Sequence, residues 1–165
     1  MVVIGFDPGS AITGFGVISG RGNRLRHVEH GAIRTSPKQS TAQRLQSLFQ
    51  DAEKLIARIK PDAVAIERLY FKQNVTTGIQ VAQARGVLLL AAANANCVIG
   101  EFSPTEMKTA VTGYGRADKE QLQEMVRRLL NLSEIPRPDD AADALALAIC
   151  QIQFGAVQDR IQSGA

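Results

Sequence analysis

Short apolar stretches separated by turn residues predict five strands. Residues 2–6 and 63–67 are almost entirely apolar, which is typical of buried strands. Residues 14–19 and 25–35 follow the first stretch across short turns, and this arrangement favours an antiparallel meander. Residues 98–102 predict one more strand. Because the first and the 63–67 strands are the most apolar, we expect them to be central neighbours in one sheet.

Apolar residues spaced three and four apart predict the helices. The predicted helices cover residues 41–59, 75–96, 104–113, 118–130 and 139–154. Thr41 is a possible cap for the first, and Ser103-Pro104-Thr105-Glu106 matches a capping box that opens the third. The order of elements predicts an α/β fold with a mixed five-stranded sheet flanked by helices. We expect a single domain over residues 1–154 and a flexible C-terminal tail over residues 155–165.

Composition narrows the classes of protein that remain. The 165 residues include 45% hydrophobic and 21% charged residues, which is ordinary for a globular protein and argues against disorder. The net charge of +3 permits a polyanionic partner without requiring one. Cys97 and Cys150 lack zinc-like spacing, so we expect buried, reduced thiols. The longest apolar run, residues 87–93, is too short to span a bilayer, and a cytoplasmic location is expected.

Four carboxylates stand where burial would penalise them or where they share a helix face. Asp7 and Glu67 end the two most apolar strands, and Asp140 and Asp143 are three residues apart at the start of a helix. If the two strands are neighbours, these side chains form an oxygen-only cluster, which suits Mg²⁺ or Mn²⁺. Two such ions about 3.5–4 Å apart support in-line attack of water on a phosphodiester.

Each acid also has a simpler interpretation. Asp7 before Pro-Gly fits a turn, and Glu67 fits a solvated strand end. First-turn acids are favoured by the helix dipole, and we assign Asp139 mainly to the helix cap. Two apolar strands that both end in acids, together with the Asp140 and Asp143 pair, are harder to explain in this way. The combination favours a metal site.

Basic and aromatic residues near these acids indicate contacts with nucleic acid. Lys119 lies in the first turn of a helix, where its charge opposes the dipole, so it is a candidate to hold a phosphate. Lys108 and Arg116 precede it on the short helix and in the following loop. Tyr70 and Phe71 follow Glu67, and either could stack on a base or cover the core. Solvated surface is the alternative for the basic residues.

Four motifs together resemble the RuvC family of bacterial Holliday-junction resolvases. They are IGFDPGSAITGFGVI at residues 4–18, AIERLYF at 65–71, QARG at 83–86 and DDAADALALAI at 139–149. They stand in the family's order, and the resemblance covers the chain up to the tail.

The resemblance implies a ribonuclease H-like fold and a homodimer. It implies Mg²⁺-dependent paired nicks in four-way DNA, in which a metal-activated water attacks the scissile phosphate to leave a 5′-phosphate and a 3′-hydroxyl. It places the catalytic and metal-binding acids at Asp7, Glu67, Asp140 and Asp143, with two Mg²⁺ ions per subunit and Mn²⁺ as a substitute. DNA contacts fall on Lys108, Lys119 and Tyr70, with Arg116 as our addition. A branch-migration complex, made of a junction-binding protein and an ATPase motor, is the implied partner. We also expect Gly14 and Gly16 to let the DNA backbone approach.

Three alternatives compete with this interpretation. A kinase or ATPase of the actin and sugar-kinase type needs a second comparable domain, for which the chain has no room. A DNA-binding module without catalysis would gain from losing the four acids. A related ribonuclease H-like nuclease that acts on another branched nucleic acid stays open.

Overall fold

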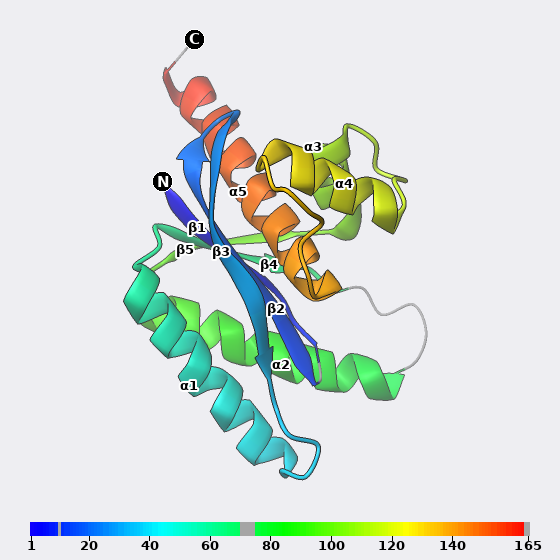
Figure 1. Ribbon diagram of the computed structural model, residues 1–165. Coiled ribbons are helices and arrows are strands. Elements are labelled where there is room, and N and C mark those ends of the chain that lie inside the picture. Colours follow the sequence, from blue (N-terminus) through cyan, green and yellow to red (C-terminus); the bar gives the residue numbers. More distant parts are fainter. Residues whose placement is uncertain (10, 70–74, 164–165) are drawn as a thin grey trace.

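The computed structural model describes residues 1–9, 11–69 and 75–163, which form one mixed sheet with helices on both faces (Figure 1). The strands are β1 (Val2–Asp7), β2 (Ile12–Arg21), β3 (Arg24–Arg34), β4 (Ala63–Glu67) and β5 (Val98–Phe102). The helices are α1 (Thr41–Ile59), α2 (Val75–Asn94), α3 (Pro104–Thr112), α4 (Lys119–Leu129) and α5 (Asp139–Ser163). The strand order is β3-β2-β1-β4-β5. β1 to β3 form the predicted antiparallel meander, and β1, β4 and β5 run parallel. β1 and β4 lie side by side in the middle of the sheet, which confirms the prediction that they are central neighbours.

Alternation along the strands divides the core between the two faces of the sheet. One face of β1 and β4 carries Ile4, Phe6, Val64 and Ile66, which pack against α1 and α2. The other face carries Val3, Ala63 and Ala65, which pack against α5 with α3 and α4 outside it. Successive strand residues point to opposite faces, so Asp7 and Glu67 share the α5 face.

The α5 helix lies unusually close to β1 and β2 because glycines line the strand surface beneath it. A Cβ added to Gly14 would lie 2.1 Å from the carbonyl oxygen of Asp140, and one added to Gly16 would lie 2.7 Å from the backbone nitrogen of Leu145. These two glycines therefore make room for α5, and not for a DNA backbone as we expected from the sequence. Their role is to bring the first turn of α5 onto the sheet.

Capping side chains set the ends of several helices. Ser40 caps α1 in a capping box with Gln43, so the expected Thr41 is the first helical residue instead. Ser103 and Glu106 form the predicted capping box of α3. Asp118 caps α4 in the same way.

The last helix is longer than predicted. It continues past Phe154 to Ser163, so residues 155–163 belong to α5 and are not a separate tail. The sequence favoured a break at Gly155, but one glycine within a helix costs only about 1 kcal/mol. Both cysteines are free thiols, and Cys97 is half-buried where full burial was expected, while Cys150 is buried. Over the described ranges, none of the helices has the length and apolar character needed to cross a membrane.

Candidate active site

Two strand ends carry the first half of the site. β1 and β4 are parallel, with Phe6 opposite Ile66, so Asp7 and Glu67 end the two strands at the same level. Both point toward α5, and both are half-buried. The sequence prediction that these two acids meet at one edge of the sheet is consistent with this register.

The first turns of α5 bring the other two acids to the same place. Asp143 lines a pocket of about 230 Å³ together with Asp7 and Glu67. The remaining lining residues are Pro104, Met107, Lys108, Lys119, Leu122 and Leu147. Asp140 lies directly over Gly14, which is the cross-strand partner of Asp7. Two strand ends and one helix start thus gather the four acids around the end of β1.

Burial and mutual repulsion both act on these carboxyls. Burial raises the pKa of Asp7 to about 8, and the charges of Asp143, Glu67 and Asp140 add to the effect. Burial also raises the pKa of Glu67, with Asp143 contributing. Burial raises the pKa of Asp143, against the opposing charge of Lys119. The site therefore holds negative charge poorly unless a cation offsets it.

The donor set fits a hard divalent cation. Every candidate ligand offers carboxylate oxygens, which Mg²⁺ and Mn²⁺ prefer to nitrogen or sulfur. As the side chains stand, no three Asp, Glu, His or Cys residues within the described ranges are arranged to chelate one ion. Ligation would therefore require side-chain rotation about the fixed ends of β1, β4 and α5.

The predicted DNA-contacting residues differ in where they lie. Lys108 on α3 and Lys119 on α4 both line the pocket beside the acids. Arg116 lies exposed in the loop between these helices and is not among the described lining residues of the pocket. Tyr70 and its alternative Phe71 lie outside the described residues. The structure thus brings two of the four predicted contacts to the acids.

Asp139 has a partner that sequence reasoning did not assign to it. Its carboxylate lies 3.1 Å from the ammonium of Lys119, and it also pairs with Arg137. The hydrogen bond to Asp139 raises the pKa of Lys119 and keeps it charged. Asp139 therefore does more than open α5, since it holds a pocket lysine by its side chain.

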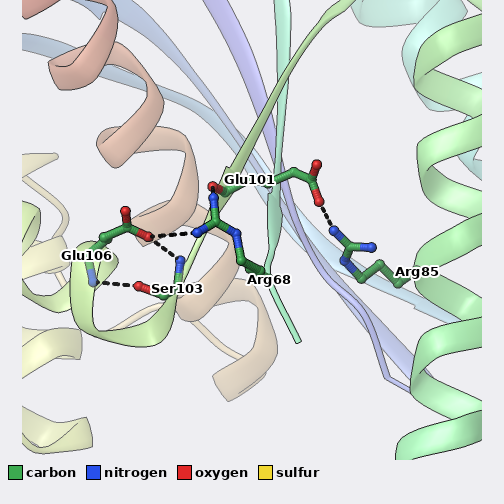
Figure 2. A network of polar contacts seen from close by, with 5 residues as sticks. All are labelled: Arg68, Arg85, Glu101, Ser103 and Glu106. Carbon is green, nitrogen blue, oxygen red and sulfur yellow. Dashed lines mark hydrogen bonds and ion pairs between the residues drawn. The ribbon is translucent and has the colours of Figure 1, made fainter. Parts of the chain in front are cut away.

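Sequence reasoning also missed a polar network that contains Arg85, Glu101 and Arg68 (Figure 2). Arg85 of α2 donates from Nε to the Glu67 carbonyl oxygen at 2.9 Å and pairs with Glu101 of β5. Arg68 donates to the Glu101 carbonyl oxygen at 2.9 Å. The QARG motif marked Arg85 in the sequence, but nothing in its spacing indicated these partners.

The sheet order and the carboxylates at the ends of β1, β4 and the start of α5 define a ribonuclease H-like nuclease. Comparison with known proteins is more specific. The sequence profile of the crossover junction endodeoxyribonuclease RuvC matches residues 3–151. The chain belongs to this family, whose members are metal-dependent nucleases.

Individual relatives agree with the profile. The crossover junction endodeoxyribonuclease RuvC of Heliobacterium modesticaldum is 56% identical over 150 residues, which cover 91% of this chain and 93% of the relative. The structure of Thermus thermophilus RuvC in complex with a Holliday junction substrate superposes with a TM-score of 0.91 at 33% identity, covering 96% of both chains. The yeast mitochondrial Holliday junction resolvase shares the fold, with a TM-score of 0.70 at 13% identity over 98% of this chain and 83% of the yeast chain.

Proposed function

We propose that this protein resolves Holliday junctions by paired, symmetric nicks in two strands of four-way DNA. The observation that carries the proposal is the pocket in which Asp7, Glu67 and Asp143 face Lys108 and Lys119. Acids able to hold cations and lysines able to hold a phosphate then meet at one point. The family to which the chain belongs also supports the proposal, because homologues are named as junction endonucleases. Such a protein would act in homologous recombination and DNA repair.

The four acids would hold Mg²⁺, for which Mn²⁺ should substitute, and we propose two ions per subunit. Bound there, the ions would lower the pKa of water and neutralise charge that develops on the phosphate. The pKa of Asp7 is raised by burial and by the charges of all three other acids, so it is the best candidate to contact both ions. Glu67, Asp140 and Asp143 would complete the ligand set.

The remaining site residues would position DNA. Lys108 and Lys119 would contact the scissile phosphate and offset its negative charge. Water's oxygen would bond to phosphorus as the bond to the 3′ oxygen breaks, which leaves a 5′-phosphate and a 3′-hydroxyl. We assign Arg116 to backbone contacts outside the pocket and Tyr70 to stacking on a base.

We further propose a homodimer formed through α2. The outer face of this helix carries Ile79 and Leu90, which are 52% and 54% exposed. Gln83 and Gly86 lie between them at helical spacing, and a Cβ at Gly86 would meet no atom within 4 Å. We call Ile79, Gln83, Gly86 and Leu90 the α2 stripe. A small residue between two apolar ones allows a second helix to approach closely, and two-fold symmetry would supply one active site for each cut strand.

Two parts of the proposal concern the cell rather than the site. A branch-migration complex, made of a junction-binding protein and its ATPase motor, is the proposed partner. We place the protein in the cytoplasm, where bacterial DNA lies. Co-purification of the tagged protein with such a complex would test the first point.

The decisive experiment compares substrates and one variant. The full chain is incubated with Mg²⁺ and a synthetic four-way junction, a linear duplex or a flap. We expect paired symmetric nicks in the junction alone, and Asp7→Asn should abolish them while junction binding persists. Binding without cleavage would separate the metal site from DNA recognition.

Two results would refute parts of this proposal. Equal cutting of linear duplex would exclude selectivity for junctions, and nicking by Asp7→Asn would exclude the metal assignment. Faster cutting of the flap than of the junction would favour the alternative, a related nuclease for another branched nucleic acid.

A further inference from the structure

Glu67 is the last residue of β4, so contacts from outside the strand are needed to hold its backbone in place. The ladder between β4 and β5 reaches Glu67, opposite Phe102, and the next amide, of Arg68, donates to the Phe102 carbonyl oxygen at 2.7 Å. The chain then leaves the sheet. A ligand at a strand terminus can keep its geometry only if the backbone there is held in place.

Arg85 supplies such a hold from α2. Its Nε donates to the Glu67 carbonyl oxygen at 2.9 Å while its guanidinium pairs with the Glu101 carboxylate. The Arg85 side chain is only 19% exposed, and its bond to the Glu67 carbonyl oxygen is partly buried, whereas the Glu101 carboxylate is 43% exposed. A planar guanidinium can make two such contacts in fixed directions, whereas a lysine ammonium is a single point charge.

The same network continues to the helix that carries Lys108 (Figure 2). Arg68 bonds the Glu101 carbonyl oxygen and lies 3.9 Å from the Glu106 carboxylate. Glu106 in turn accepts a hydrogen bond from the backbone nitrogen of Ser103 at 2.8 Å and thus helps to cap α3. The two elements β4 and α3, which contribute residues to the pocket lining, are therefore linked through β5 to α2.

We propose that Arg85 is a positioning residue that holds the backbone of Glu67 in the orientation needed for metal binding. It touches neither substrate nor metal and acts through the Glu67 carbonyl and Glu101. This inference rests on the proposed role of Glu67 as a metal ligand. It also gives the QARG motif a physical purpose within the site.

The test measures Mn²⁺ binding directly, by electron paramagnetic resonance of the full chain without DNA. Arg85→Ala should raise the dissociation constant for Mn²⁺ by about 10-fold, since loss of groups that orient metal ligands typically costs 10- to 100-fold. Arg85→Lys, which keeps the charge and one donor, should show a smaller increase. Glu101→Gln keeps an acceptor for Arg85 and should bind Mn²⁺ like the wild type.

Arg58→Gln is the control, because Arg58 of α1 pairs with Glu29 of β3 and neither residue is among the described lining residues of the pocket. It also removes an arginine–glutamate pair between a helix and a strand, and it should leave Mn²⁺ binding unchanged. Equal weakening in Arg58→Gln and Arg85→Ala would overturn the inference, because it would reflect a general loss of stability.

Other outcomes decide between the two proposals. If Arg85→Ala binds Mn²⁺ as tightly as the wild type does, Arg85 has no positioning role; if the alanine variant does not fold, the same result in Arg85→Lys would overturn that role. A wild-type protein that binds no Mn²⁺ would overturn it as well. Mn²⁺ binding that depends on Arg85, in a protein that cuts no junction, would refute the proposed function and leave the positioning role intact.

Discussion

At the scale of single residues, Asp7 is the group on which the site depends most. Burial is the main cause of its raised pKa, and the charges of three neighbouring acids add to this effect, against the opposing charge of Lys119. The folded protein therefore favours a protonated Asp7 unless a cation is bound. This makes metal binding, proton release and folding stability linked quantities.

That linkage predicts how stability depends on pH when divalent cations are removed. The pKa of Asp7 is raised from 3.8 to about 8, so the folded state keeps a proton that the unfolded chain has lost within this window. The free energy of unfolding should then fall as pH rises, by about 1.4 kcal/mol per pH unit from this group. Urea unfolding in EDTA from pH 5 to pH 8 measures it.

Asp7→Asn is the control for this pH dependence. It removes the titrating group and relieves repulsion on Glu67 and Asp143, so its profile should be flatter and its stability at pH 8 higher than that of the wild type. Added Mg²⁺ should stabilise the wild type most at the upper end of the range. An Asp7→Asn profile as steep as the wild-type one would contradict the assignment.

Adjacent acids at the start of α5 should have different roles. Asp140→Asn should lower the junction cleavage rate by roughly 100-fold or more, because a ligand matters at least as much as the groups that orient it. Asp139→Asn releases Lys119 and should retain most of the activity, with a modest effect through the lysine. The test compares the single-turnover cleavage rates of the two variants, after a binding assay has shown that both bind the junction equally well. Equal losses would refute the distinction.

The sequence predicted that these acids lie close together, because strand ends and helix starts are local features. Asp7 and Glu67 follow runs of apolar residues, and Asp140 with Asp143 fits one helix turn. The partners of Arg85 and of Asp139 were not predictable in this way. A contact between α2 and the end of β4 depends on how two distant elements pack, and no periodicity in either element encodes it.

At the scale of elements, the approach of α5 to the sheet determines whether the acids meet. The face of the sheet that packs against α5 carries small or medium-sized side chains at Val3, Ala63 and Ala65. At Gly14 and Gly16 it carries no side chain at all. The apolar pattern predicted most strand and helix bounds to within two residues. It did not predict this close contact, because a glycine in a strand has several possible explanations.

A methyl group at Gly16 should therefore push α5 away from β2. The new Cβ would lie 2.6 Å from Cγ and 2.7 Å from the backbone nitrogen of Leu145, so the helix would have to shift. We expect Gly16→Ala to destabilise the protein by about 1–3 kcal/mol, as overpacking does. Cleavage should fall as well, because the shift moves Asp140 and Asp143. Chemical denaturation and cleavage rates measure the two effects.

Gly155→Ala is the control, because Gly155 lies in α5, the helix against which Gly16 packs. Its Cβ would meet only Met1 Sδ, at an ordinary 3.8 Å, among the described atoms. Replacing a helical glycine by alanine should stabilise the protein by about 0.5–1 kcal/mol. Equal destabilisation by both substitutions would argue that close packing of α5 on β2 is not the cause.

At the scale of the whole molecule, the arrangement separates the site from the proposed partner surface. The acids lie on the α5 face of the sheet, while α2 covers the opposite face and carries the α2 stripe on its outer side. A second subunit on α2 would therefore leave the pocket accessible to DNA. Arg85, one residue before Gly86, lies in the segment of α2 that carries the stripe, and its side chain bonds the Glu67 carbonyl oxygen.

If the proposed dimer forms through α2, a charge in the α2 stripe should convert it into monomers without unfolding the chain. Leu90 is 54% exposed, so Leu90→Asp should change the stability of the isolated chain by no more than about 0.5 kcal/mol. Sedimentation velocity at micromolar concentration should then give the mass of one chain, against two for the wild type. Val28→Asp on β3 is the control, since Val28 is similarly exposed at 47% and lies outside α2.

The loss of the dimer should also be visible in the products. A cruciform plasmid becomes linear when both strands are nicked within one encounter and becomes an open circle when one is nicked. Because each monomer carries a complete set of acids, Leu90→Asp should produce open circles and few linear molecules, whereas Val28→Asp should linearise the plasmid like the wild type. A dimeric Leu90→Asp protein would exclude the α2 stripe as the interface. Linear products from a monomeric variant would show that paired nicking does not require the dimer.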